Sequence, residues 1–201
     1  QWPSSAASDV YKRQKEYNGF KIVINNSSFK EEDIQNLKFK IEQSDFKIGS
    51  GKLLKESFNE SYIKEISKKI EIKKKLKIVL DCGNGSGGVL GPEILRKYSS
   101  ELIELFCEVD GNFPNHHPDP SEPKNLFNLI ETVKIEDADL GIALDGDGDR
   151  LGVVDSEGEI IFPDRYLALM AEDTLKKNKS GKIVFDVKCS NQLDKVIREN
   201  D

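Results

Sequence analysis

Three aspartates separated by single glycines are the residues of this sequence best suited to chemistry. Asp145, Asp147 and Asp149 stand in the run Leu-Asp-Gly-Asp-Gly-Asp-Arg, directly after an apolar segment. Carboxylates this close together repel one another unless a cation lies between them. Glycine lets the backbone curl, so that all three carboxylates can turn toward one hard divalent ion and bind it through oxygen. The spacing therefore predicts a metal-binding loop.

Arg150, beside the last aspartate, indicates what such a metal would act on. A calcium-binding EF-hand also begins with alternating aspartates, but it needs glycine at its sixth position and glutamate at its twelfth. Counted from Asp145, those positions hold Arg150 and Ser156, so the EF-hand pattern fails at both. A guanidinium next to a metal can grip a phosphate and neutralise the charge that develops in phosphoryl transfer. The loop is expected to serve chemistry on phosphate.

The segments around this loop alternate between strand and helix patterns. Apolar runs predict strands at 20–24, 76–81, 102–108, 138–144 and 182–187, and a hairpin from 151–154 and 159–162. Helical spacing is found at 31–43, 62–72, 92–97, 125–135, 163–177 and from 191 onward. This alternation predicts the α/β class, with a doubly wound and mostly parallel sheet. The aspartate loop would lie at the end of the strand 138–144.

Composition narrows the classes of partner. The chain has 201 residues, of which 36 are acidic and 30 basic, and the lysines form no stripe interleaved with aromatics, so no nucleic-acid partner is expected. No apolar run approaches the ~20 residues of a membrane span, so no membrane partner is expected either. Cys82, Cys107 and Cys189 lack the spacing of a zinc site and are interpreted as core residues in a reducing compartment. The expected location is the cytoplasm.

Two further motifs are interpreted as structural. The glycine-rich run from Cys82 to Gly88 fits neither of the common phosphate-binding glycine patterns, so a tight turn is favoured over a phosphate cradle. His116 and His117 stand in a polar loop between prolines, and adjacent side chains on an extended chain point apart. A metal shared by the two histidines is therefore not expected.

Four stretches of the chain resemble the α-D-phosphohexomutases, in the phosphomannomutase/phosphoglucomutase branch. The stretches are DADLGIALDGDGDRLGVVDSEGEIIFPDR, KIVLDCGNGSGG, GNFPNHHPDPSEPKNL and KIVFDVKCSNQL, and the resemblance runs from Lys15 to Asp201. It implies that Asp145, Asp147 and Asp149 bind Mg²⁺. It also implies that Arg150 approaches the active-site phosphate as a catalytic and substrate-binding residue.

The same resemblance implies an activity and a division into domains. The family interconverts hexose 1-phosphates and hexose 6-phosphates through a phosphoserine, as an isomerase that acts by intramolecular phosphotransfer. Residues 15–58 would be the end of domain I, 59–157 domain II, and 158–201 the start of domain III. The recognition loops of the later domains would lie outside the chain, so mannose and glucose substrates are not distinguished.

The resemblance also implies that the catalytic serine would stand just before Lys15 and is absent. Residues Ser4 to Gln14 read as the translation of a transposon adapter used for sequencing libraries, so residues 1–14 are expected not to be native. A fragment of this kind is expected to be inactive alone. The resemblance also matches Lys21 to a family lysine proposed to assist proton transfer as a catalytic residue, whereas its sequence context alone favours a surface lysine on a strand over a catalytic one.

Two other functions stay open. The chain could be a stand-alone module that binds a metal or a phosphosugar without turnover. It could also be a structural or interaction domain whose acidic turn binds nothing, and such a domain would gain no thermal stability from magnesium.

Overall fold

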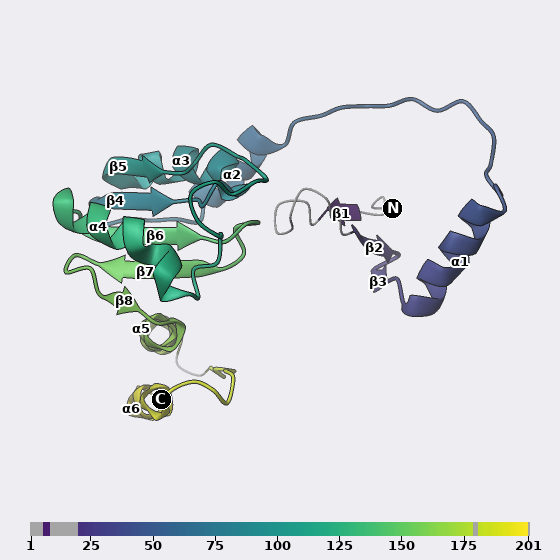
Figure 1. The fold of residues 1–201 in the computed structure, drawn as a ribbon. Helices are drawn as coiled ribbons and strands as arrows, with labels where there is room; N and C mark the ends of the chain where they lie inside the picture. The colour runs from purple at the N-terminus through teal and green to yellow at the C-terminus, as the bar shows by residue number, and fades with distance from the viewer. Residues whose placement is uncertain (1–5, 9–19, 179–180, 201) are drawn as a thin grey trace.

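A computed structural model gives the structure of the chain and describes residues 6–8, 20–178 and 181–200. Most of these residues belong to a five-stranded sheet with helices on both faces (Figure 1). Its strands are β4 (Leu76–Asp81), β5 (Ser99–Leu105), β6 (Leu140–Leu144), β7 (Leu151–Asp155) and β8 (Ile160–Ile161). Its helices are α2 (Asn59–Ser67), α3 (Gly87–Tyr98) and α4 (Phe127–Ile135), the last preceded by a 3₁₀ turn at Pro123–Leu126.

The sheet has the order β5-β4-β6-β7-β8, and β4 pairs in parallel with both β5 and β6. The chain leaves β4 through α3 toward β5, and then returns through α4 across β4 to β6. Since parallel crossovers are right-handed, these opposite directions place α3 and α4 on opposite faces. The remaining pairs, β6 with β7 and β7 with β8, are antiparallel. The predicted α/β class is confirmed, and the predicted hairpin supplies the antiparallel edge.

Burial in β4 reflects this cover on both sides. Val79 and Leu80 are adjacent and both fully buried, as expected for a strand with a helix on each face. Val79 belongs to the core beneath α4, with Leu129 and Val133 of that helix. Leu80 faces Gly91 of α3. Each fully buried leucine or valine stabilises the fold by about 1.5–3 kcal/mol relative to an exposed one.

Three loops meet at one edge of the sheet because parallel strands end on the same side. They follow β4 (residues 82–86), β5 (residues 106–122) and β6 (residues 145–150). The last of these is the predicted metal-binding loop.

The chain before α2 forms a separate small unit. It contains β1 (Ala6–Ser8), β2 (Phe20–Ile24), β3 (Ser27–Ser28) and α1 (Glu31–Glu42). Asn25 and Asn26 both have positive φ, 51° and 62°, as the two-residue turn between β2 and β3 requires. Residues 43–58 then run without helix or strand to the larger sheet (Figure 1). The strand and helix predicted here are confirmed, although α1 has no buried residue.

The proposed adapter sequence, residues 1–14, lies largely outside the described residues. Of it, the structure describes only β1, which pairs antiparallel with β2. The interpretation of these residues as non-native stays a prediction, as does the division of the chain into domains.

Two helices follow the sheet, α5 (Pro163–Lys177) and α6 (Asn191–Glu199), and they pack against each other. Ala171, Leu175 and Leu193 are buried there. The strand predicted at 182–187 is wrong. Within the described residues no strand pairs with this segment, and its Val184 and Val187 are 91% and 96% exposed. A β-prone run needs a neighbouring strand for its backbone hydrogen bonds, and sequence alone does not supply one.

Several boundaries differ from the predicted ones by a few residues. Helix α2 covers 59–67 rather than 62–72, and β5 covers 99–105 rather than 102–108. Helix α3 begins at Gly87 rather than at Pro92, because the glycines that suggested a turn continue into its first turn. In the part of the chain that the structure describes, no helix is both long and apolar enough to cross a membrane.

Candidate metal centre

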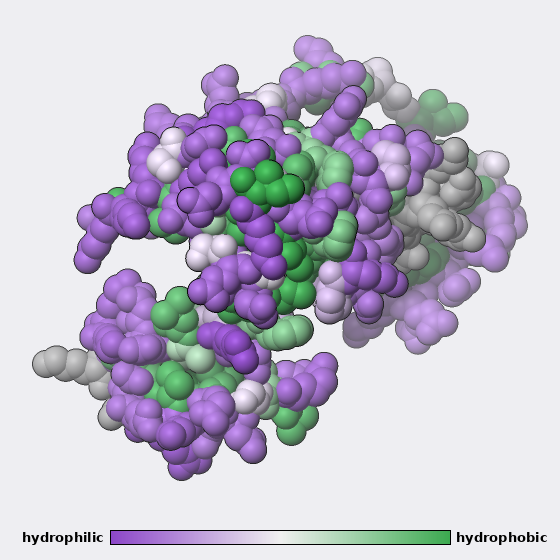
Figure 2. Space-filling model, turned by 60° about the vertical axis from the view of Figure 1, so that its left-hand side comes forward, coloured by the Kyte–Doolittle hydropathy of each residue, from purple (hydrophilic) through white to green (hydrophobic). Residues whose placement is uncertain are grey.

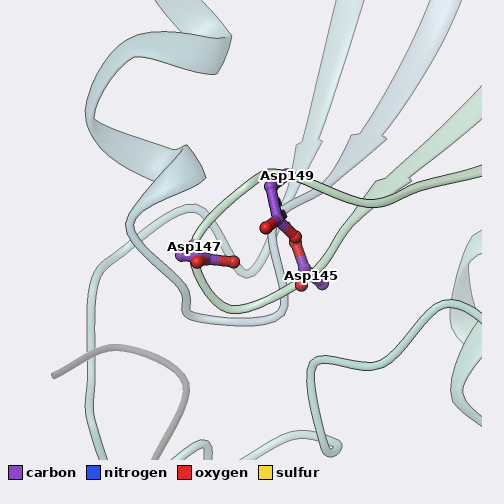
Figure 3. A group of neighbouring side chains, drawn as sticks. All are labelled: Asp145, Asp147 and Asp149. Atoms are coloured by element: carbon purple, nitrogen blue, oxygen red, sulfur yellow. Dashed lines mark hydrogen bonds between the residues drawn. The ribbon is translucent and has the colours of Figure 1, made fainter. Parts of the chain in front are cut away.

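The loop between β6 and β7 brings the three predicted aspartates together. One carboxylate oxygen from each of Asp145, Asp147 and Asp149 can be chosen so that all three lie within 4.8 Å of one another. Figure 3 shows the side chains projecting from this one loop, with Asp147 directed toward the other two. Asp145 is fully buried, whereas Asp147 and Asp149 are exposed. The cluster is therefore buried at Asp145, next to the end of β6, and exposed to solvent at Asp147 and Asp149.

Asp145 holds the loop in shape. Its Oδ1 accepts hydrogen bonds from the backbone N–H groups of Asp149 and Arg150, both at 2.9 Å. Its Oδ2 accepts from Nε of Arg150, also at 2.9 Å. Gly148, with φ of 72°, allows the chain to turn back over the carboxylate. One buried side chain thus sets the conformation of the whole loop.

The donor set fits a hard divalent cation. Mg²⁺ and Ca²⁺ bind oxygen ligands, and carboxylates are their usual protein ligands. A carboxylate has two oxygens, and one oxygen of Asp145 lies within 4.8 Å of an oxygen from each of the other two aspartates. Asp147 and Asp149 present their carboxylates at the solvent-exposed side, where a metal can enter.

Arg150 lies between two carboxylates from different loops. Its Nε donates to Asp145, and its Nη1 donates to Oδ1 of Asp119 at 3.0 Å. The hydrogen bond to Asp145 and the negative charge of Asp119 raise the pKa of Arg150 above its ordinary value, so its charge is permanent. The side chain is 51% exposed. It presents a fixed positive charge next to the aspartate cluster.

The glycine-rich turn after β4 supports the metal loop from behind. The N–H and the hydroxyl of Ser86 both donate to the carbonyl oxygen of Gly146, at 2.9 and 3.2 Å. A Cβ on Gly85 would come within 2.7 Å of that same oxygen, so only glycine permits the approach. The N–H groups of Asn84, Gly85 and Gly88 are also bonded to backbone carbonyls. The predicted tight turn is confirmed, and these internal bonds favour a structural role for it.

A buried ion pair anchors the loop that follows β5. Nε2 of His116 lies 3.0 Å from Oδ2 of Asp81, whose side chain is almost completely buried at the end of β4. Asp81 also accepts from the N–H of Gly83 at 2.8 Å. His117 points elsewhere and packs edge-on against Phe113. The two histidines diverge as predicted, but the pairing of His116 with Asp81 has no sequence signal because 35 residues separate them.

This pair predicts a pH dependence of stability. The hydrogen bond that His116 donates to Asp81 raises the pKa of His116 above its usual 6.5, although burial opposes the shift. A raised folded-state pKa means that the stabilisation is complete below the unfolded-state value and is lost as pH rises through the folded-state value. We expect urea unfolding midpoints to fall as pH rises above about 6.5. Asp81→Asn should remove most of this dependence, and an equally steep decline in that variant would contradict the assignment.

Two of the three cysteines meet in the fold. Sγ of Cys82 lies 3.2 Å from Sγ of Cys107, and both thiols are free. The hydrogen bond between them, together with burial, raises the pKa of Cys82. Cys82 is buried as predicted, whereas Cys107 and Cys189 are only partly buried. The contact arises because β4 and β5 are neighbours in the sheet.

Lys21 is placed apart from these groups in the topology. It lies in β2, within the small N-terminal sheet, and not in the sheet that carries the aspartates. Its side chain falls outside what the structure describes. A catalytic role for Lys21 stays a prediction.

A cavity of about 510 Å³ adjoins the metal loop on the side of α5. Asp149 and Arg150 line it at the loop, and most of the remaining wall is apolar, with Pro120, Leu126 and Phe162 among its residues. Figure 2 shows apolar surface between the body of the sheet and the smaller α5–α6 pair at lower left. Such a wall offers few partners for the hydroxyl groups of a sugar.

The fold and the site together define an α/β domain that carries an acidic loop and an arginine at the carboxyl edge of its sheet. Residues 60–158 match the family model for phosphoglucomutase/phosphomannomutase, alpha/beta/alpha domain II. The chain is 48% identical over 185 residues to a phosphomannomutase/phosphoglucomutase of Pseudomonas putida, covering 92% of this chain and 40% of that protein. It is 43% identical over 187 residues to a phosphoglucomutase of Neisseria meningitidis, covering 92% of this chain and 41% of that protein.

A solved structure agrees with these relatives. A phosphoglucomutase/phosphomannomutase family protein from Burkholderia thailandensis has 42% identity and a TM-score of 0.85, covering 98% of this chain and 43% of that chain. The chain belongs to the phosphoglucomutase/phosphomannomutase family, as its resemblance to the phosphohexomutases indicated. It spans about 40% of the length of the curated relatives that it matches.

Proposed function

We propose that this chain is the metal- and phosphate-binding portion of a phosphohexomutase, an isomerase that interconverts hexose 1-phosphates and hexose 6-phosphates. The observation that carries the proposal is the convergence of three carboxylates within 4.8 Å beside an arginine that Asp145 and Asp119 hold in place. Names of the relatives that match most of this chain support the reaction.

The proposed metal is Mg²⁺, held by Asp145, Asp147 and Asp149. Mg²⁺ usually keeps several waters and is bound by few carboxylates together with substrate phosphate, which suits an exposed cluster next to a cationic side chain. When bound, the ion would stabilise negative charge that develops on a transferring phosphoryl group. Arg150 would bind and orient a phosphate oxygen through its guanidinium.

The remaining parts of the proposal concern the whole protein. The phosphate-carrying serine and the groups that recognise the sugar would come from regions that match no residue of this chain, and Lys21 would assist proton transfer. The cavity beside Arg150 is mostly apolar and offers few partners for sugar hydroxyl groups. This supports the proposal that the described residues hold the phosphate end of the substrate, while other regions of the whole protein bind the sugar. Three free thiols favour the cytoplasm, since disulfides are rare there.

A binding module without turnover is the second candidate, and the same cluster favours it. The two candidates predict the same metal binding and differ in catalysis. Conversion of glucose 1-phosphate or mannose 1-phosphate to the 6-phosphate by the whole protein that contains this chain decides between them. Loss of that conversion in the Asp147→Asn variant would tie it to the cluster.

Metal binding by the chain itself is tested by thermal and chemical unfolding with and without MgCl₂. At a concentration ten times the dissociation constant, Mg²⁺ should stabilise the chain by about 1.4 kcal/mol. Asp147→Asn should abolish this gain. Glu157→Gln, which removes the same charge from an exposed position outside the loop, should retain it. A wild-type chain with no gain from Mg²⁺ would leave only the structural-domain interpretation.

A further inference from the structure

Arg150 is gripped at two different nitrogens by carboxylates from two different loops. Nε donates to Asp145 of the metal loop at 2.9 Å, and Nη1 donates to Asp119 of the loop after β5 at 3.0 Å. A guanidinium is planar and rigid, so bonds at two of its nitrogens fix the rotation of the plane as well as its position. Asp145 alone would leave the distal end of Arg150 able to swing.

Asp119 is itself held in place before it meets Arg150. The N–H and the hydroxyl of Ser121 both donate to Oδ1 of Asp119, at 3.1 and 2.7 Å. Nδ2 of Asn125 donates to the backbone carbonyl of Asp119 at 2.9 Å, and Asn125 is buried. Partial burial raises the pKa of Asp119, but the bonds from Ser121 and the charge of Arg150 outweigh it and lower the pKa overall. The carboxylate that faces Arg150 is thus both ionised and oriented.

We propose that Asp119 is a positioning residue, which aims the guanidinium of Arg150 at a phosphate bound beside the aspartate cluster. The inference rests on the proposed function for the identity of the ligand, a phosphate ester or inorganic phosphate. It assigns to the loop after β5 a part in the site that the alternating aspartates do not reveal. Hydrogen bonds through Asp119 thereby link buried Asn125, in the 3₁₀ turn before α4, to the exposed guanidinium of Arg150.

The ion pair between Arg150 and Asp119 is expected to add little to the stability of the fold. The side chains of Arg150 and Asp119 are 51% and 23% exposed, and ion pairs at such positions contribute little to folding. The contact can instead favour anion binding, because an arginine whose side chain is already ordered loses less conformational entropy when it binds an anion. An opposing effect is competition, since Asp119 occupies a donor that a phosphate could use. The two effects predict opposite changes in phosphate affinity when the carboxylate is removed.

The test uses the full chain in MgCl₂ and three variants. Asp119→Ala removes the acceptor, Asp119→Asn retains a neutral oxygen, and Glu122→Ala removes an exposed carboxylate from the same loop as a control. Two quantities are measured by NMR: rotation and hydrogen exchange of the Arg150 guanidinium, and the dissociation constants of inorganic phosphate and glucose 1-phosphate. Backbone spectra of each variant establish that the fold is retained.

Positioning predicts faster guanidinium rotation and about three- to tenfold weaker phosphate binding in Asp119→Ala, the factor for ordering one flexible side chain. Asp119→Asn should recover part of both, and Glu122→Ala should match the wild type. Unchanged or tighter phosphate binding in Asp119→Ala would overturn the proposal. If the wild-type chain binds no phosphate, the proposed function fails for this chain, and guanidinium rotation alone decides: unchanged rotation overturns the positioning role, and faster rotation supports it.

Discussion

Replacing Asp145 with alanine is expected to lower the free energy of unfolding by about 3 kcal/mol, even without metal. The carboxylate is fully buried and accepts hydrogen bonds from two backbone N–H groups and from Nε of Arg150. Alanine leaves these donors without their acceptor. Hydrogen bonds to a charged group contribute about 1.5–3 kcal/mol each, and the exposure of Arg150 lets water replace part of that loss. Metal-dependent stabilisation should disappear as well.

Asp147→Ala is the matched control for this change. It removes a carboxylate from the same cluster, but from an exposed position. Substitutions at exposed positions usually change stability little, so we expect the metal-free stability to change by less than about 0.5 kcal/mol. Urea unfolding in EDTA and in MgCl₂ measures both effects. Equal destabilisation by the two variants in EDTA would show that Asp145 does not organise the loop.

Gly88→Ala should destabilise the fold by about 2–3 kcal/mol, although it places a better helix former in α3. A Cβ at this position would overlap the carbonyl oxygen of Cys107 and lie 2.8 Å from its carbonyl carbon. Both are backbone atoms, so no side-chain rotation can relieve the clash. Either α3 or the start of the loop after β5 must move. Since α3 begins at the turn that supports Gly146, we also expect weaker Mg²⁺ binding.

Gly91→Ala tests the same change one turn further along α3. There a Cβ would meet Cδ2 of Leu80 at 3.4 Å, an ordinary contact with a flexible side chain. Helix propensity then favours alanine, and we expect the variant to be as stable as the wild type or up to about 1 kcal/mol more stable. Urea unfolding of the two variants in parallel measures the difference. A Gly88→Ala variant as stable as Gly91→Ala would mean that the approach to Cys107 is not tight.

The sequence predicts which residues make up the acidic loop, but it does not predict how deeply each of them is buried. The convergence of the three aspartates is predictable from the sequence because they stand in one short run. A local turn can bring their carboxylates together without contacts from the rest of the chain. Arg150 was predicted for the same reason. The structure shows that the three aspartates differ in burial and therefore in role. Asp145 is buried and holds the loop, while Asp147 and Asp149 face solvent. Burial depends on what covers the sheet edge, and the run itself does not contain that information.

The sequence by itself determined the α/β class, the order of the elements, the acidic loop and the family. Periodicity and local turn chemistry are properties of neighbouring residues, so they are legible along the chain. The sequence did not reveal that the run 182–187 would remain without a strand beside it, because pairing depends on distant segments.

Only the tertiary structure decided which distant side chains meet. Asp119 reaches Arg150, His116 reaches Asp81 and Cys107 reaches Cys82 across 31, 35 and 25 residues. Each contact exists because β4, β5 and β6 are parallel neighbours whose following loops share one edge of the sheet. That adjacency is fixed by strand order and crossover direction, which the packing of the whole domain selects.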